Sequence, residues 1–353
     1  MALPDRQRLI LKDIVDRYIR QREPVSSRMI LEDYGLHVSS ATVRNDMNAL
    51  EEEGYIEKPY SSSGRVPTRK GYRFFVDWLI DLSELTKKER GEIVEAYQFG
   101  LLEVGETLRQ TAFLIGNMTG YAGFVIPPQV EETRLSQVVL VKMAPRMVFL
   151  VIVSDIGVVE HGLIPLEDEL SETDMKRIVE LINANLRGAT LDAVRSLTQE
   201  ESPEGWYERP VRQALVVLGR LLDRQIRQQL YSEGMLNLPA ILREVSPDLA
   251  MERFVALIHA LHDEERFTDT IREMRAERSG LVIAVGDSPI EALEDFSLVT
   301  AGYGPHGGIL GAIGPLWMDY GKALSTVSYV ANRLETIFVG SCAASLGGSC
   351  DDR

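Results

Sequence analysis

The sequence predicts an α+β protein of several domains that begins with a winged helix-turn-helix. Three observations support this prediction. Residues 24–73 hold two short helical patterns around a turn and then a basic hairpin, in the order of parts of that fold. Residues 135–166 form three β-rich runs, and amphipathic helical patterns follow them. A length of 353 residues allows two or three domains, each with its own core.

The first helix is predicted from four apolar side chains that recur at i, i+3, i+4 and i+7 and would share one face. These are Leu11, Ile14, Val15 and Tyr18. Pro24 ends this helix. A second, short helix is expected between a cap at Ser26 or Ser27 and a stop at Gly35. The second helix and the turn after it would form the first half of a helix-turn-helix.

A third helix is predicted from a cap at Ser39 or Ser40 to about Glu53, before Gly54. One side of this helix is apolar, and the other carries residue types that bond base edges in the major groove. The predicted base-reading residues are Ser40, Ala41, Arg44, Asn45 and Asn48. Three carboxylates at residues 51–53 would repel phosphates, so only the N-terminal half of the helix is expected to enter the groove.

A basic hairpin follows, with short strands at residues 55–58 and 65–68 joined by a polar loop. Residues 58–73 hold five basic side chains and no acidic one, which predicts a positive surface beside the third helix. Such a surface would bind phosphates and add affinity more than sequence preference. The predicted phosphate and wing contacts are Ser39, Thr42, Lys58, Ser62, Arg65, Arg69, Lys70 and Arg73.

The charge distribution favours the same division of the chain. Residues 1–80 hold 13 Lys and Arg against 12 Asp and Glu, whereas the remaining residues hold 25 against 41. Because DNA is a polyanion, only the N-terminal part is suited to bind it. One recognition helix reads only a few base pairs, so two half-sites held by a two-fold dimer are expected.

Beyond the hairpin, a linker helix is predicted from Tyr72, Phe75, Val76 and Leu79 at helical spacing. Thr86 and Glu89 form a capping box, and the apolar pattern after them predicts one long helix to about Met118. The β-rich runs are expected at residues 135–143, 147–154 and 158–166. The connections between these runs are short enough for an antiparallel meander.

Two long segments resemble a known family. Residues 39–77 (SSATVRNDMNALEEEGYIEKPYSSSGRVPTRKGYRFFVD) resemble the N-terminal signature of the HrcA-type heat-inducible transcription repressors of bacteria, and residues 297–334 resemble their C-terminal block. Residues 286–289 read Gly-Asp-Ser-Pro where relatives more commonly have Gly-x-Glu-Asn. The resemblance implies a homodimer that binds an inverted-repeat operator upstream of chaperone operons, with chaperonin as a helper of repressor activity.

The resemblance and the pattern together predict the domains. Residues 1–82 would hold the winged helix-turn-helix and linker helix, and residues 87–134 with 229–341 a discontinuous GAF-like α/β domain. Residues 135–228 would be an inserted dimerisation domain of an antiparallel sheet plus helices, and residues 342–353 a flexible tail. A helical stripe in the insertion is either a dimer interface or plain core: Val211, Leu215, Leu218 and Leu222. Later strands of the GAF-like domain are expected near residues 281–285, 296–301 and 309–313.

Catalytic and metal-binding motifs are weak in this sequence. Residues 302–307 satisfy G-x-G-x-x-G, but a β-like run follows where a dinucleotide site needs a helix, so a hairpin turn is predicted. His259 and His262 have no third ligand at a recognised spacing. Neither a nucleophile motif nor a phosphate loop is found, and the two cysteines form no framework. We expect neither an enzyme nor a cofactor or metal.

The most apolar segment, residues 138–153, is interrupted by Lys142 and Arg146, and no export signal precedes it. A cytoplasmic protein without membrane contact is therefore expected. Two functional hypotheses remain open. In the first, the acidic body controls assembly, so that heat or lack of chaperonin inactivates the repressor. In the second, the GAF-like domain binds a small effector.

Overall fold

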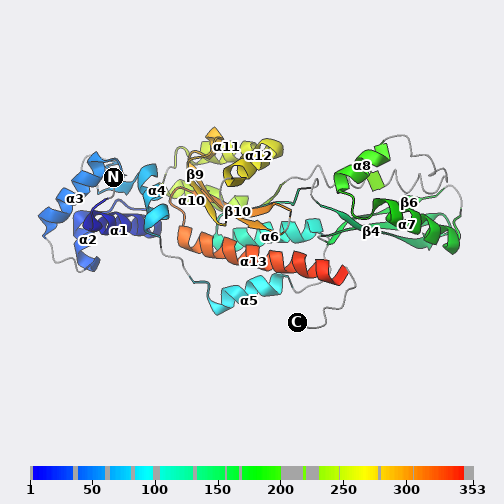
Figure 1. Ribbon diagram of the computed structural model, residues 1–353. Helices are drawn as coiled ribbons and strands as arrows, with labels where there is room; N and C mark the ends of the chain where they lie inside the picture. Colours follow the sequence, from blue (N-terminus) through cyan, green and yellow to red (C-terminus); the bar gives the residue numbers. More distant parts are fainter. Residues whose placement is uncertain are drawn as a thin grey trace.

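The computed structural model describes residues 3–34, 39–59, 64–80, 84–97, 104–129, 133–155, 157–166, 169–199, 218–219, 230–245, 247–276, 280–304 and 306–345. The chain is elongated and has three units in a row (Figure 1). The N-terminal unit comprises the described residues up to residue 80. The central unit comprises the described residues of 84–129 and 230–345. The distal unit comprises the described residues of 133–219.

The N-terminal unit has the predicted helix-turn-helix. Helix α1 (Asp5–Gln21), α2 (Ser27–Tyr34) and α3 (Ser40–Glu52) pack on one another, and their apolar stripes are buried. Ser39 caps α3 by accepting a hydrogen bond from the Thr42 backbone N–H at 3.2 Å, as predicted. Beyond the C-terminal end of α3, Gly54 takes a positive φ of 76°. An L-residue with a side chain rarely adopts that conformation, so glycine suits this stop.

The wing is an antiparallel pair of β1 (Ile56–Glu57) and β2 (Val66–Pro67), in which Ile56 pairs with Pro67. An isolated bridge between Val25 and Arg65 ties the wing to the start of α2. Helix α4 (Arg69–Trp78) begins directly after β2, with Thr68 as its cap. The predicted linker helix is thereby confirmed. Its buried face packs on the N-terminal unit, and its other end reaches the central unit.

The central unit is built on a five-stranded antiparallel sheet with the order β7-β3-β10-β9-β8. Its strands are β3 (Ala122–Ile126), β7 (Tyr231–Glu233), β8 (Val282–Val285), β9 (Phe296–Tyr303) and β10 (Gly308–Pro315). Segments from both sides of the distal unit pair in this sheet, because β3 lies between β7 and β10. The strands predicted at residues 281–285, 296–301 and 309–313 are confirmed.

Helices cover the central sheet. Helix α6 (Val104–Thr119) and α13 (Tyr320–Ser345) lie side by side and pack on the strands, whereas α10 (Leu238–Val245), α11 (Ala250–His262) and α12 (Glu264–Ala276) lie on the other side in Figure 1. A membrane-spanning helix is not found in the described part of the chain, since no helix there combines the required length and hydropathy.

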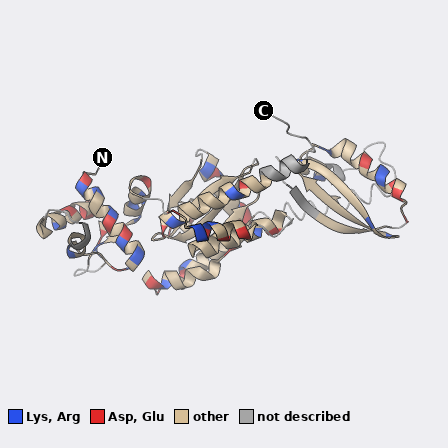
Figure 2. Cartoon of the chain, turned by 90° about the horizontal axis from the view of Figure 1, so that it is seen from below, with Lys and Arg blue, Asp and Glu red and all other residues tan. Residues whose placement is uncertain are grey.

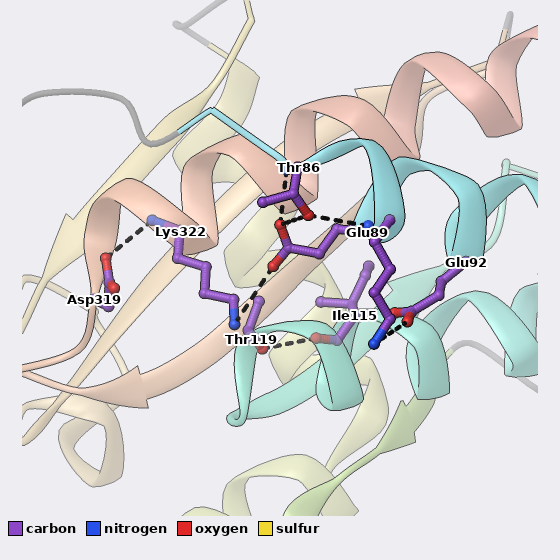
Figure 3. Close-up of polar contacts among 8 residues, drawn as sticks. Thr86, Glu89, Glu92, Ile115, Thr119, Asp319 and Lys322 are labelled. Atoms are coloured by element: carbon purple, nitrogen blue, oxygen red, sulfur yellow. Dashed lines mark hydrogen bonds and ion pairs between the residues drawn. The ribbon is translucent and has the colours of Figure 1, made fainter.

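The single long helix expected from Thr86 to Met118 was wrong. The structure has two helices, α5 (Lys87–Ala96) and α6, and α5 folds back against α6 and α13. The capping box at Thr86 and Glu89 is confirmed (Figure 3). Lys322 of α13 lies 3.9 Å from the Glu89 carboxylate, so the pair holds the start of α5 on the central unit. Long-range contacts, absent from a local pattern, therefore override the continuous helix.

The distal unit contains the predicted meander. Strands β4 (Leu135–Ala144), β5 (Met147–Ser154) and β6 (Gly157–Pro165) form an antiparallel sheet, and α7 (Glu172–Leu186) packs on one face of it. Helix α8 (Leu191–Gln199) follows. This unit has its own hydrophobic core, whereas a single core runs through the N-terminal and central units.

The helical stripe proposed as a dimer interface falls largely outside the described residues. Val211, Leu215 and Leu222 are among the residues that the structure does not describe. Leu218 is 0% exposed and belongs to the core of the distal unit. A side chain buried inside its own chain cannot contact a partner, so the core alternative holds at Leu218.

Candidate nucleic-acid interface

Helix α3 presents one polar face to solvent and buries the opposite one. Val43, Met47 and Leu50 are buried in the core of the N-terminal unit. The five residues predicted to read bases are all exposed: Ser40, Ala41, Arg44, Asn45 and Asn48. Within the described part of the chain, neither Arg44 nor Asn45 has a side-chain hydrogen bond or an ion pair. These two side chains are therefore free to bond an external partner.

The start of α3 offers further hydrogen-bonding groups. The Ser39 and Thr42 hydroxyls lie 3.0 Å apart, and Ser39 also caps the helix. Unpaired backbone N–H groups and the positive end of the helix dipole favour an anion at such a terminus. The position is consistent with the predicted phosphate contacts of Ser39 and Thr42, and it lies at the same end of α3 as Arg44.

A partly buried ion pair that the sequence reasoning missed holds α3 in place. Asp46 is 6% exposed and accepts two hydrogen bonds from Arg6 of α1, from Nε at 2.6 Å and from Nη2 at 3.2 Å. The bonds to Asp46 raise the pKa of Arg6. Asp46 interrupts the apolar stripe of α3, and an acidic residue on a buried face needs a partner. That signal was present in the sequence, although it does not identify Arg6.

The wing carries less free positive charge than the sequence predicts. Arg65 is 8% exposed, and its guanidinium donates to Glu51 Oε2 at 2.8 Å and to Asn48 Oδ1 at 3.1 Å. Lys58 lies 3.7 Å from the same Glu51 carboxylate. Arg65 therefore connects the wing to α3. The side-chain oxygen of Asn48 already accepts a hydrogen bond from Arg65.

Lys70 also has interaction partners within the protein. Its ammonium group donates to the Glu53 carbonyl oxygen at 2.6 Å and lies 4.2 Å from the centre of the Tyr55 ring. Of the predicted wing residues, Ser62 lies outside the described residues. Among acidic residues 51–53, which were expected to repel DNA, the Glu51 carboxylate also neutralises part of the wing charge.

Arg69 and Arg73 point to the central unit. Arg69 donates to the Glu294 carbonyl oxygen at 3.0 Å and lies 3.6 Å from its carboxylate. Arg73 donates to Asp287 Oδ2 at 2.5 Å and also contacts Asp77. Carboxylates far away in sequence or within α3 thus pair with Lys58, Arg65, Arg69 and Arg73, so the patch carries less unpaired charge than a count of basic residues suggests. Its contact with phosphates stays a prediction. Figure 2 shows basic and acidic residues interleaved along the helices of the N-terminal unit.

The weak motifs have structural explanations. Residues 302 and 303 end strand β9, and residues 304, 306 and 307 belong to the turn that leads to the antiparallel strand β10. Gly304 and Gly307 have positive φ values of 66° and 68°. The predicted hairpin turn is confirmed. His259 and His262 are exposed on α11, and the described residues contain no group of three or more metal-binding side chains.

Comparisons with known proteins cover nearly the whole chain. Residues 105–324 match the family described as HrcA protein C terminal domain, and residues 11–64 match the DeoR-like helix-turn-helix domain. The heat-inducible transcription repressor HrcA of Pelotomaculum thermopropionicum is 33% identical over 96% of this chain and 97% of its own length. The repressor of the same name from Halalkalibacterium halodurans is 32% identical over 94% of this chain and 96% of its own.

A solved structure has the same overall arrangement. The crystal structure of a hypothetical protein at 2.2 Å resolution superposes with a TM-score of 0.71 at 25% identity, covering 96% of this chain and all of that chain. An exposed polar face on a capped helix, a helix-turn-helix match and near full-length relatives agree with one another. This chain belongs to the HrcA family of heat-inducible transcription repressors.

Proposed function

We propose that the chain represses chaperone operons by binding an inverted-repeat operator as a homodimer. The observation that carries this proposal is the exposed face of α3, on which Arg44 and Asn45 are free of partners in the described part of the chain. Arg can bond guanine and Asn can bond adenine, each through two hydrogen bonds. Repression then requires occupancy of the promoter and no chemistry.

The paired cations of the wing refine the mode of DNA binding. Because Arg65 and Arg73 are already paired with carboxylates, fewer counterions are released when the wing meets phosphates. Base contacts and the α3 terminus then supply a larger share of the binding free energy. We infer that the operator affinity falls less steeply with salt than a wing with five free charges would predict.

Dimerisation is assigned to the distal unit. On β5, alternate residues such as Val148 and Leu150 are buried under α7, so Phe149 faces the other side of the sheet. Phe149 pairs in register with Val141 and Leu163, which are 46% and 54% exposed. An apolar sheet face of this kind is suited to a second copy of the same face about a two-fold axis.

A charge on this face tests the dimer. Leu163→Glu is expected to yield a monomer that binds a half-site and a full repeat equally, measured by light scattering and by anisotropy. Lys176→Glu is the control, since Lys176 is exposed on α7, on the opposite side of the sheet. A Leu163→Glu variant that remains dimeric would refute this interface. It would not refute the repressor proposal, which the operator titration tests separately.

The proposed domain assignment follows the family. We assign the central unit to a GAF-like domain and the distal unit to a dimerisation domain inserted into it. Two separate cores support the assignment, because the distal unit can loosen without exposing the core shared by the other two units. Heat inactivation would then act by loss of the dimer, and chaperonin would act by refolding the chain.

A salt-dependent anisotropy titration tests the function directly. The full-length chain is titrated on an inverted-repeat operator, on a half-site and on a random duplex, with and without chaperonin. We expect tight binding to the full repeat alone, and recovery of heated protein by chaperonin with ATP. Equal weak binding to all three duplexes would contradict the proposed function.

A further inference from the structure

Helix α4 joins the N-terminal unit to the central unit, and two of its arginines bond the central unit (Figure 1). Arg69 donates to the Glu294 carbonyl oxygen at 3.0 Å and lies 3.6 Å from the Glu294 carboxylate. One turn further along α4, Arg73 donates to Asp287 Oδ2 at 2.5 Å and to the Ile283 carbonyl oxygen at 3.4 Å. Each arginine therefore meets both a carboxylate and a backbone oxygen of the central unit.

A third ion pair crosses the junction from a different helix. Arg22, at the end of α1, lies 3.7 Å from the Glu244 carboxylate of α10. In all three pairs the N-terminal unit supplies the cation and the central unit supplies the carboxylate. Exposed ion pairs add little stability, but complementary charges at separate points fix the orientation of two surfaces. These pairs therefore favour one angle between the two units.

Gly286 provides the space in which Arg69 lies. Its φ is 64°, and its N–H donates to the Phe296 carbonyl oxygen at 3.0 Å, at the start of β9. A Cβ built at Gly286 lies 2.6 Å from Arg69 Nε and 2.6 Å from the Glu294 carbonyl oxygen. A side chain at this position would therefore displace the arginine from its acceptor. Residues 286 and 287 thus supply the space for one arginine and the carboxylate for the other.

Apolar packing at the junction is incomplete next to these pairs. A cavity of about 520 Å³ lies there, and its wall includes Arg69 and Tyr72 from α4 and Leu316 and Trp317 from the central unit. Apolar contact has no preferred direction, whereas charge-assisted hydrogen bonds do. The core that continues through both units holds them together, and the ion pairs determine their relative angle.

The angle between the units determines where α3 lies relative to the rest of the chain. Helix α4 packs on α1 and on the wing strand β2, so the N-terminal unit moves with it as one body. A dimer must place both copies of α3 on half-sites at a fixed distance. We propose that Arg69 and Arg73 are positioning residues that set this angle and thereby the half-site spacing that the repressor prefers. The inference rests on the proposed function, but it assigns these arginines no contact with DNA.

A distance measurement without DNA tests the angle. Spin labels are placed on Glu52→Cys of α3 and His259→Cys of α11, both exposed positions, in a chain whose native cysteines are replaced by serine. Labelled chain is mixed with excess unlabelled chain, so that electron–electron resonance reports distances within one copy. We expect a narrow distribution for the unsubstituted junction, a broad one for Asp287→Arg, and a narrow one again when Arg73→Glu is added to Asp287→Arg. Glu291→Arg is the matched control, expected to stay narrow, since Glu291 is exposed nearby and the change in charge is the same.

An anisotropy titration on operators with different spacers tests the consequence for DNA. Asp287→Arg is expected to bind a half-site as tightly as Glu291→Arg does, because α3 is unchanged. Its affinity for the full repeat with the preferred spacer should fall roughly tenfold, because the second half-site is no longer aligned with the second copy of α3. Its dependence on spacer length should flatten for the same reason. The charge-swapped pair, Arg73→Glu with Asp287→Arg, should recover the spacer preference.

Three results would overturn the proposal. A narrow distance distribution in Asp287→Arg would show that the ion pair does not set the angle. A broad distribution with an unchanged spacer preference would show that the angle does not select the spacing. Half-site binding weakened by Arg73→Glu alone, but not by Asp287→Arg, would identify Arg73 as a phosphate contact. If the unsubstituted chain binds no repeat, the proposed function fails, whereas the distance measurement still decides whether the arginines set the angle.

Discussion

Arg65 Nη2 lies 2.7 Å from Glu51 Oε2, and this pair joins the wing to the C-terminal end of the recognition helix. Arg65 also bonds Asn48, one helical turn earlier on α3. The arginine thus fixes the angle between the wing and the helix. Its contribution to DNA binding is expected to be indirect, through the shape of the N-terminal unit.

Replacement of Arg65 should therefore reduce stability before it reduces affinity. Arg65→Ala leaves the Glu51 carboxylate without this partner, and the free energy of unfolding is expected to fall by about 1 to 3 kcal/mol. Chemical denaturation of the variant measures this change. Unchanged stability together with weaker binding to all DNA would restore Arg65 to the role of a phosphate contact.

Arg44 should behave in the opposite way. Arg44→Ala removes an exposed side chain with no partner in the described part of the chain, so the stability should not change. Operator binding is expected to weaken by about 1 to 3 kcal/mol, with relaxed preference at one base pair, in anisotropy titrations on operator variants. Equal losses on operator and random DNA would show that Arg44 does not read bases.

Helix α4 approaches the wing too closely for any side chain at Gly71. A Cβ built at Gly71 collides with the backbone carbonyl oxygen of Tyr55. Gly71→Ala must therefore displace α4 from the wing, at a cost of about 1 to 3 kcal/mol in the free energy of unfolding. Gly91→Ala is the control, since a Cβ there meets nothing within 4 Å. Similar unfolding midpoints for the two variants would contradict this packing.

Two tyrosines should respond differently to the loss of a hydroxyl. Tyr97→Phe removes a bond to Thr111 and should cost about 1 kcal/mol of unfolding free energy. Tyr72→Phe removes a buried hydroxyl without a partner, so the stability should stay the same or rise. Chemical denaturation of both variants makes the comparison. An equal loss in the two would show that the Tyr72 hydroxyl is already paired.

Acid should release α5 from the central unit. The backbone and side-chain hydrogen bonds from Thr86 lower the pKa of Glu89 below its ordinary 4.5 (Figure 3). This stabilisation is present above the ordinary pKa and is lost as the pH falls through the lowered value. Hydrogen-exchange protection of α5 should therefore fall at acid pH. Glu89→Gln should show reduced protection without that pH dependence, whereas a parallel decline in both proteins would exclude Glu89 as the cause.

Much of the local structure could be predicted from the sequence, because it depends on near neighbours. The apolar spacing of α1, the cap at Ser39 and the β-rich run of β5 are local, and the structure confirms them. The exposed face of α3 follows from the same spacing. Base contact itself stays a prediction.

The partners of the basic residues could not be predicted in this way. Glu294 and Asp287 lie more than 200 residues from Arg69 and Arg73 along the chain, and only the folded topology brings them together. The same holds for the end of α5, where Tyr97 turns back to bond Thr111. A count of charges therefore overestimated the positive surface, because it contains no information on which carboxylate each cation meets.

The distal unit meets the central unit where His306 Nε2 lies 2.8 Å from Asp155 Oδ2. The distal unit forms the opposite end of the molecule from α3 (Figure 1). If two copies of the chain are joined through their distal units, the N-terminal and central units of each copy form a long arm that rotates about the contact near His306. A rotation of a few degrees about this contact then displaces α3 along the DNA much further than it displaces the atoms near His306. In such a dimer, the stiffness of the contact between the distal and central units sets the range of half-site spacings that can be bound, although this contact does not touch the operator.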